Sequence, residues 1–209
     1  MSVNLPSGRI EITRDAISAA ATDPAQVAAR VQLAKFVSQC FDEVGTLLHL
    51  SGDIVGPDRE SGASPFGHGS DETVAIALLL RIASQSVSAG TDLFIDGRSY
   101  ALAALVRQMV EVEYLAWAFE SWDHDAARWL SSSKDERQQL FTPANLQKAA
   151  GKKFRSKDYG YHCELGGHPV PTSEILFCDQ ASIPQLLLSD LRGHVRESLH
   201  RFCVHSLID

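Results

Sequence analysis

The sequence has few of the features that identify common enzyme and nucleic-acid-binding classes. Basic residues are not in excess: 19 Lys and Arg stand against 26 Asp and Glu, for a formal net charge of −7. A nucleic-acid-binding surface usually shows as a basic face, so we expect no nucleic-acid partner. The cysteines (Cys40, Cys163, Cys178 and Cys203) form no C-x-x-C pair. Scattered thiols are typical of a reducing compartment and predict a cytoplasmic protein.

Targeting and metal-binding signals are also lacking. The N-terminal residues contain no basic segment followed by an apolar run, so no secretory signal is predicted. The most apolar segment, residues 99–120, is interrupted by Arg107, Gln108, Glu111 and Glu113. These polar residues favour a core helix over a membrane span. No P-loop, G-x-S-x-G or H-E-x-x-H motif occurs. We therefore predict neither a metal nor a cofactor.

No alternating run is long enough to predict a sheet, whereas helical periodicity recurs along the chain. Long helices are expected at residues 24–50, 70–90, 98–121 and 184–207, with shorter helices between residues 123 and 165. The Gly-, Ser- and Pro-rich residues 51–70 predict a long loop. Residues 1–12 predict a flexible arm, and residues 13–209 a single domain. The predicted fold class is an all-α bundle of about five main helices with long loops.

The central predicted helix carries a charged pair, Arg107 and Glu111, inside an otherwise apolar segment. At about 100° per residue, Tyr100, Arg107, Glu111 and Tyr114 fall on one narrow stripe. Glu113 and Glu120 lie elsewhere around the helix, and the simplest assignment makes them the solvent-exposed strip. The Arg107 stripe would then face another helix. In the competing geometry, Arg107 and Glu111 are themselves the exposed stripe.

Two interpretations of this pair remain open. A structural Arg–Glu pair would hold the helix in register. A polar pocket would use the planar guanidinium of Arg107 to bind a carboxylate or phosphate. His168, which follows two glycines and precedes Pro169, is the predicted third member of this centre. A histidine so placed is either a fixed polar contact or a catalytic base.

An R-x-x-x-E helix (Arg107, Glu111), followed by a tyrosine-rich turn that ends in G-H-P at His168 and then by a long last helix, resembles a bacterial helical family of unknown function. Tyr161 is the fourth matching residue, although it stands seven residues before His168, and Glu164 replaces a usual serine. That family is regarded as distantly similar to the HEPN helical proteins of toxin–antitoxin and defence systems. The resemblance implies an all-helical fold and a role in defence or regulation, but no settled activity.

Active HEPN-type ribonucleases carry an arginine and a histidine separated by four to six residues, and Arg155 and His162 have six between them. Two hypotheses follow. In the first, the protein binds a small anion or a protein partner through Arg107, Glu111 and His168, with Tyr100 and Tyr114 beside them. In the second, it is a ribonuclease-like enzyme that uses Arg155 and His162. A homodimer is compatible with both hypotheses.

Overall fold

The computed structural model describes residues 23–55, 71–121, 125–151, 153–154, 158–177 and 182–206. These residues form helices and no strands, which confirms the all-α prediction. Four helices are long: α2 (Pro24–Val55), α3 (Asp71–Ile95), α4 (Ser99–Ser121) and α9 (Ser182–Ser206). Four are short: α5 (Asp125–Ser131), α6 (Lys134–Leu140), α7 (Pro143–Ala150) and α8 (Asp158–His162). A π-helical turn, η1 (Cys163–Gly167), and a 3-10 helix, η2 (Pro171–Phe177), follow α8.

The number of helices differs from the expected five or so, since the described residues form eight α-helices. The difference lies in the segment between α4 and α9, which is broken into short pieces by local caps. Ser133 accepts a hydrogen bond from the backbone N–H of Glu136 at 3.2 Å and starts α6. Thr142 and Pro143 start α7, and Gly151, with a φ of 64°, ends it. The predicted arm of residues 1–12 lies outside the described residues.

Two predicted helix ends are wrong. Helix α2 continues past Ser51 and Gly52 to Val55, and α3 continues past Gly90 to Ile95. Gly90 is inside α3 because α9 packs closely there: a Cβ atom on Gly90 would lie 3.1 Å from Leu191 Cδ2. The actual end is Gly97, whose φ of 70° suits glycine. Its N–H donates to Phe94 O, and the next N–H, of Arg98, donates to Leu93 O.

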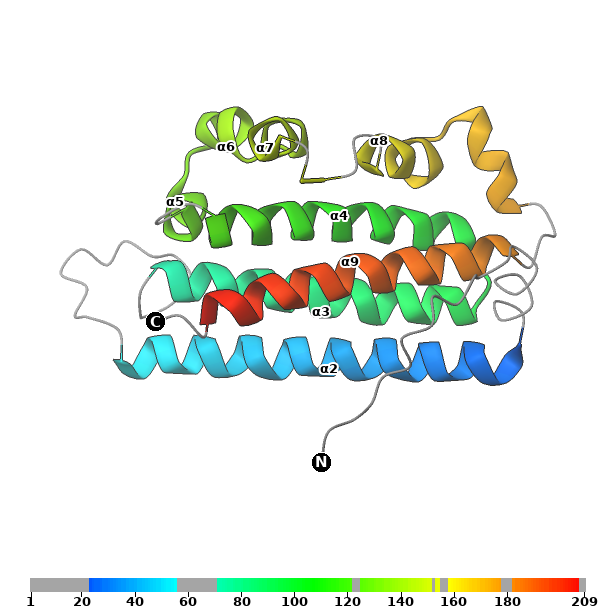
Figure 1. The fold of residues 1–209 in the computed structure, drawn as a ribbon, viewed down its shortest axis with the longest axis horizontal. Helices are drawn as coiled ribbons and strands as arrows, with labels where there is room; N and C mark the ends of the chain where they lie inside the picture. Colours follow the sequence, from blue (N-terminus) through cyan, green and yellow to red (C-terminus); the bar gives the residue numbers. More distant parts are fainter. Residues whose placement is uncertain are drawn as a thin grey trace, which may run out of the picture.

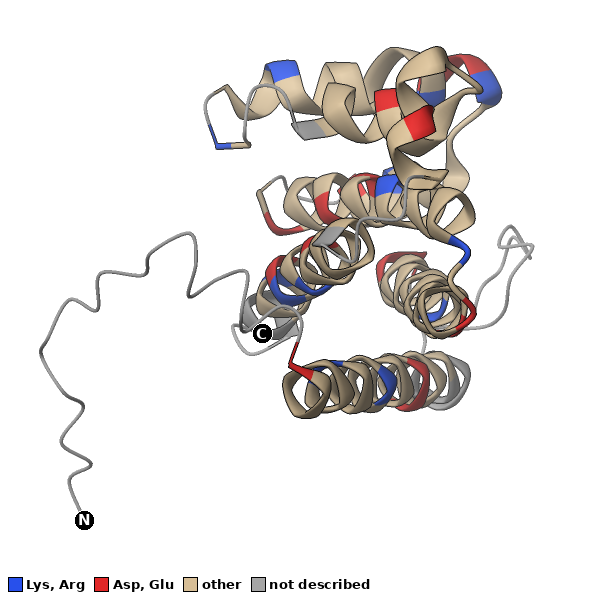
Figure 2. Cartoon of the chain, turned by 90° about the vertical axis from the view of Figure 1, so that its right-hand side faces the viewer, with Lys and Arg blue, Asp and Glu red and all other residues tan. Residues whose placement is uncertain are grey.

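The four long helices run side by side, and α4 is enclosed on both sides (Figure 1). Helix α2 packs on α3, and both α3 and α9 pack on one side of α4. The short elements α7, α8, η1 and η2 cover the other side of α4. Acidic and basic residues are spread over all the layers rather than gathered on one face (Figure 2). This double coverage explains why the sequence of α4 is apolar around most of its circumference.

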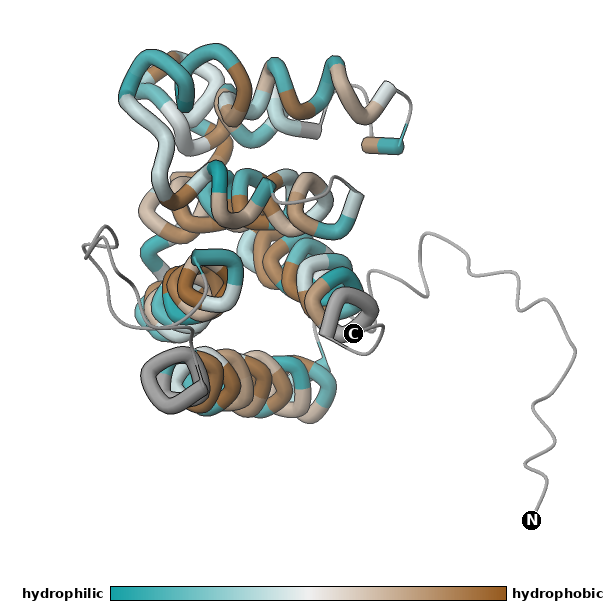
Figure 3. The backbone as a smooth tube through the Cα atoms, turned by 90° about the vertical axis from the view of Figure 1, so that its left-hand side faces the viewer, coloured by the Kyte–Doolittle hydropathy of each residue, from teal (hydrophilic) through white to brown (hydrophobic). Residues whose placement is uncertain are grey.

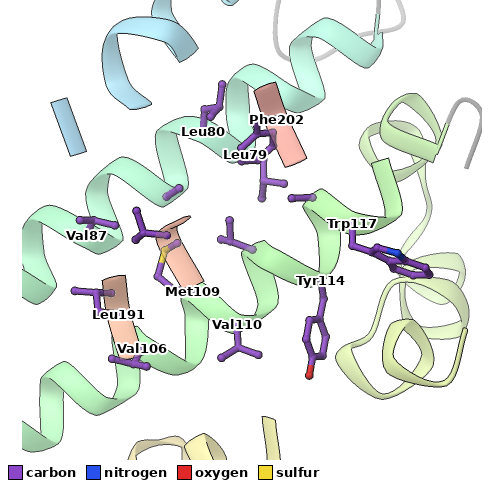
Figure 4. Packing of buried hydrophobic residues seen from close by; sticks show 14 of the residues in the cluster. Leu79, Leu80, Val87, Val106, Met109, Val110, Tyr114, Trp117, Leu191 and Phe202 are labelled. Atoms are coloured by element: carbon purple, nitrogen blue, oxygen red, sulfur yellow. The ribbon is translucent and has the colours of Figure 1, made fainter. Parts of the chain in front are cut away.

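The core lies between α3, α4 and α9 (Figure 4). Leu79, Met109 and Leu191, one from each helix, are each at most 1% exposed. On the outer side of α4, Tyr114 stacks on Phe154, with ring centroids 4.0 Å apart. Aromatic rings therefore attach the short elements to the bundle.

Helix α3 is the one helix among the described residues that is long and apolar enough to cross a membrane. Of its most apolar 18-residue window, 56% is buried inside the bundle. A core helix has the same properties, so composition alone does not distinguish the two cases.

The turn η1 approaches the backbone of α4 more closely than any side chain would permit. A Cβ atom on Gly166 would lie 2.5 Å from both Ala103 C and Ala104 N. Backbone atoms cannot move aside as a flexible side chain can, so only glycine fits at this position.

We therefore expect Gly166→Ala to force η1 away from α4. The overpacking should lower the free energy of unfolding by about 3 kcal/mol. For a chain of this size, that corresponds to a melting temperature lower by roughly 6–12 °C, measurable by circular dichroism. Gly160→Ala is the matched control, because a Cβ atom there would meet nothing within 4 Å. It should leave stability unchanged or raise it by up to about 1 kcal/mol. Equal effects of the two substitutions would contradict this account of η1.

Candidate functional site

Arg107 and Glu111 form an ion pair on the outer side of α4, with 2.6 Å between Arg107 Nη2 and Glu111 Oε1. The sequence did not identify the residue that joins them, which is Tyr159 from α8. Arg107 Nη2 donates a hydrogen bond to the Tyr159 hydroxyl at 2.8 Å, and that hydroxyl donates to Glu111 Oε1 at 3.2 Å. The side chains of Arg107 and Glu111 are 28% and 34% exposed. The three residues form a closed, half-buried triad that attaches α8 to α4.

The triad changes the acid–base properties of its members. Burial acts to lower the pKa of Arg107, but the hydrogen bonds that Arg107 donates to Tyr159 and Cys163 and the charge of Glu111 outweigh burial and raise it. Burial raises the pKa of Tyr159 to about 12; the hydrogen bond from Arg107 opposes that rise, and the charge of Glu111 adds to it. Both groups therefore keep their protons at neutral pH, so the triad holds a fixed hydrogen-bond pattern.

The other residues predicted for this centre have different surroundings. Tyr114 is 1% exposed and stacks on Phe154, and its ring centroid lies 6.3 Å from that of Tyr159. Tyr100 stacks on Phe177 of η2 at 6.0 Å. The whole predicted stripe thus faces the covering segment.

His168 was predicted as the third member of this centre, but it is exposed and follows η1 in an extended conformation. Tyr159, which lies in the tyrosine-rich turn but was not predicted as a site residue, contacts both Arg107 and Glu111 instead. The neighbouring Gly167 does approach the pair: a Cβ atom there would lie 3.1 Å from Arg107 Cδ.

The prediction that Glu113 and Glu120 are exposed to solvent is wrong for Glu113, whereas Glu120 is exposed as predicted. Glu113 is 8% exposed, and its Oε2 lies 2.7 Å from His194 Nδ1. Glu120 Oε2 accepts a hydrogen bond from Arg201 Nη1 at 2.8 Å. Helix α9 covers this side of α4 at Glu113, so that carboxylate has a buried basic partner, whereas the Glu120–Arg201 pair lies at the exposed end of α4. The angular positions of residues on a helix predict which residues share a face, but they do not predict which face is exposed to solvent.

The Glu113–His194 pair extends to a second buried histidine. His194 Nε2 lies 3.3 Å from Nε2 of His162, which is 1% exposed. We call these three residues the buried polar chain. Each contact needs one donor: in the tautomer in which His194 Nδ1–H donates to Glu113, His194 Nε2 accepts from His162 Nε2–H. The buried polar chain joins α4, α8 and α9 through these hydrogen bonds.

A polar cavity of about 500 Å³ opens beside the buried polar chain, between α4, α9 and residues 153–154. Its ionisable lining residues are Glu113, Lys153, Asp190, His194, Arg196, Glu197 and Arg201. Several of these charges are paired already: Arg196 with Glu197 at 2.7 Å, and Arg201 with Glu120 at 2.8 Å. The hydrogen bond from Arg196 lowers the pKa of Glu197.

Two donors beside the cavity have no acceptor among the described residues, and one of them, on Lys153, is exposed on the lining. The Lys153 ammonium lies 5.6 Å from the centroid of the Trp117 ring, and no ion pair joins it to a carboxylate of the described residues. Nε of Arg201 is buried and has no hydrogen-bond partner among the described residues. An anionic ligand in the cavity would accept from the Lys153 ammonium, and its charge would be favourable beside the Arg201 guanidinium.

Of the two residues of the ribonuclease hypothesis, Arg155 and His162, the structure describes one. His162 belongs to the buried polar chain, whereas Arg155 lies outside the described residues. Within the described part of the chain, no group of three or more His, Cys, Asp or Glu side chains is placed to hold a metal ion. Cys40 and Cys163 are free thiols.

Comparison with known protein families finds no matching family model, and comparisons with curated proteins and solved structures find no match either. The HEPN-like resemblance therefore stays a prediction.

The raised pKa of Tyr159 predicts how stability depends on pH. Between pH 10 and 12 the unfolded chain loses this phenolic proton before the folded chain does, so stability falls as the pH rises. We expect Tyr159→Phe to cost about 1 kcal/mol at pH 8 through the lost hydrogen bonds. Between pH 9 and 11, the free energy of unfolding of this variant, measured by urea unfolding, should also fall less than that of the wild type. All other tyrosines are present in both proteins, so an identical pH dependence would show that Tyr159 ionises normally.

The buried polar chain predicts strong coupling between Glu113 and His194. We expect Glu113→Leu and His194→Leu each to lower the free energy of unfolding by about 3 kcal/mol. The double variant should lose less free energy of unfolding than the two single variants lose together. The difference, measured by urea unfolding, should be a coupling energy of about 1–3 kcal/mol. Arg128 and Glu136 provide a control cycle, because they are also 2.7 Å apart but their side chains are 54% and 35% exposed. Coupling in that pair should stay below about 1 kcal/mol. Additive effects of the Glu113 and His194 substitutions would contradict the assignment.

Proposed function

We propose that this protein is a non-enzymatic binding protein, one helical domain that holds a small anionic molecule in the polar cavity between α4 and α9. A role in defence or regulation, as the resemblance implies, belongs to the same proposal. The observation that carries it is the exposed Lys153 ammonium on the cavity lining, which no carboxylate of the described residues pairs, beside the guanidinium of Arg201. A carboxylate or phosphate is the group that suits an ammonium next to a guanidinium.

The size and chemistry of the cavity support a small ligand. A volume of about 500 Å³ is within the usual range for ligand sites. Arg201 lies over the Phe154 ring, with Cζ 5.8 Å from its centroid. This contact and the ion pair with Glu120 hold the guanidinium in place before a ligand arrives, which lowers the entropic cost of binding.

The buried polar chain favours binding over catalysis. A general base must present a ring nitrogen within hydrogen-bond reach of its substrate. In His194, Nδ1 contacts Glu113 and Nε2 contacts His162, so neither nitrogen is directed at the cavity. The buried polar chain therefore stabilises the side of the cavity formed by α4 and α9, and it does not act on a ligand.

The ribonuclease hypothesis is the second candidate, and it needs RNA to reach His162. With 1% exposure, the His162 ring is closed to a polynucleotide in this conformation. The support for cleavage is limited to the sequence spacing of Arg155 and His162, so we rank it below binding. Wild type and His162→Ala can be compared for RNA cleavage, and activity in wild type alone would favour the enzyme.

The binding proposal is tested with three anions: inorganic phosphate, succinate and adenosine 5′-monophosphate. We expect at least one to bind the wild type in isothermal titration calorimetry. At ten times its Kd it should stabilise the protein by about 1.4 kcal/mol, a rise in melting temperature of roughly 3–6 °C. Lys153→Ala should weaken binding at least about tenfold, because it removes a charged donor.

Lys134→Ala is the matched control, since Lys134 is an exposed lysine at the start of α6, away from the cavity. It should leave the affinity unchanged. The proposal is wrong if none of the three anions binds the wild type, or if both lysine variants lose affinity equally.

A further inference from the structure

Helix α2 has one face buried in the bundle and another that is apolar but exposed. On the buried face, Ser38 Oγ donates to Ser84 O at 2.8 Å, and Phe41 is 1% exposed. On the other, Leu33 is 45%, Phe36 62%, Val44 46% and Leu47 62% exposed. Figure 3 shows hydrophobic residues along α2, the lowest helix in that view. Contiguous exposed apolar surface of this kind marks interaction sites in folded proteins.

The exposed apolar residues follow the spacing of a helix-pairing stripe, in which every third or fourth residue is apolar. Two small exposed residues, Ala25 and Ala29, extend the stripe toward the start of α2. We call the whole stripe the α2 seam; it consists of Ala25, Ala29, Leu33, Phe36, Cys40, Val44 and Leu47. The α2 seam spans about 33 Å at 1.5 Å per residue and about 100° around the helix. Its first third carries small side chains, and the remainder carries larger ones.

That distribution of sizes suits a second copy of the same helix running antiparallel. With a two-fold axis just after Phe36, Val44 of the second copy lies level with Ala29, and Leu47 of the second copy lies between Ala25 and Ala29. Each large residue near the end of one helix thus meets small residues near the start of the other, as close packing requires. A parallel pair would place alanine opposite alanine and leave a gap at that end.

The polar residues beside the α2 seam agree with the same arrangement. One border of the seam carries three exposed polar residues, Gln32, Gln39 and Glu43, and Gln39 Nε2 donates to Glu43 Oε1 at 2.8 Å. A two-fold axis perpendicular to the helices brings like borders together. Gln32 of one copy then lies between Gln39 and Glu43 of the other, where its amide has both a donor and an acceptor within reach. A parallel pair would set the Glu43 carboxylate against Val44, which removes water from a charge without supplying a partner.

A groove of about 440 Å³ continues this surface from α2 to α9. Leu33 and Val37 line it on α2, and Leu191, Val195 and Leu199 line it on α9. Because Leu33 belongs to both the groove and the α2 seam, the two form one apolar surface. A helix seated on the seam would cover the edge of the groove as well.

We propose that the α2 seam is a homodimer interface, in which α2 of a second copy packs antiparallel about a two-fold axis between Phe36 and Val37. This interface is separate from the polar cavity and stands independently of the proposed ligand. An isologous two-fold contact is the commonest way for identical chains to associate.

Sedimentation equilibrium over a range of concentrations tests the interface. We expect the wild type to be a dimer and Phe36→Asp to be a monomer, with association at least about a hundredfold weaker. Leu186→Asp is the matched control, because Leu186 is 53% exposed on α9 outside the α2 seam; it should remain dimeric. Circular dichroism of each variant checks that the fold is kept. A wild type that is monomeric at about 100 µM, or a dimeric Phe36→Asp, overturns the proposal.

Disulfide cross-linking tests the antiparallel direction, because Cys40 lies in the α2 seam. In the proposed dimer Leu33 of one copy is level with Cys40 of the other, whereas the two Cys40 residues are about 10 Å apart along the helix axis. A disulfide needs Cα atoms within about 7 Å of each other. We therefore expect Leu33→Cys to give a covalent dimer under mild oxidation, seen on a non-reducing gel, and the wild type to give none.

Leu47→Cys is the matched control, since a cysteine there lies about 21 Å along the axis from Cys40 of the second copy. It should not cross-link. Adding Cys40→Ser to Leu33→Cys should abolish the covalent dimer, which identifies the bonded pair. Absence of a cross-link in Leu33→Cys, or a cross-link in the wild type that Cys40→Ser removes, overturns the antiparallel arrangement.

Discussion

The burial of Glu113 is the constraint on which the rest of the structure depends. A carboxylate inside a helical bundle needs a partner, and His194 provides it at 2.7 Å. This contact fixes the rotation of α4 about its axis relative to α9. Once that rotation is set, Arg107 and Glu111 must face the opposite side, where the short helices cover them. One buried pair thus determines which residues line the cavity and which hold the outer layer.

The short elements that cover α4, among them α8 and η1, are attached to it by two kinds of contact. The triad of Arg107, Glu111 and Tyr159 supplies directional hydrogen bonds at the surface of α4. Gly166 supplies close backbone contact, since a Cβ atom there would overlap α4. The two are near each other, because Gly167 also lies against Arg107. The pair of glycines before His168, which in a sequence suggests a helix stop, is therefore a packing feature of η1.

Much of the fold was predictable, because helix periodicity and capping are local properties. The start of α2 at Pro24 and the extent of α4, Ser99–Ser121, agree with the predicted ranges to within one residue. The end of α3 was not predictable, because Gly90 marks contact with α9 rather than a helix end. Candidate site residues were harder still. Arg107 and Glu111 were recognised as unusual, but Tyr159 and His194 carry no sequence signal that connects them to α4.

The sequence by itself determined that the chain is helical, where most helices start, and that α4 holds charges which need partners. The tertiary structure alone decided which charges are inside. Glu113 and Glu111 are two residues apart on the same helix, yet one pairs with a buried histidine and the other with a half-buried arginine and tyrosine. Local propensity depends on near neighbours, whereas burial depends on residues such as His194, which is 81 positions away from Glu113 along the chain.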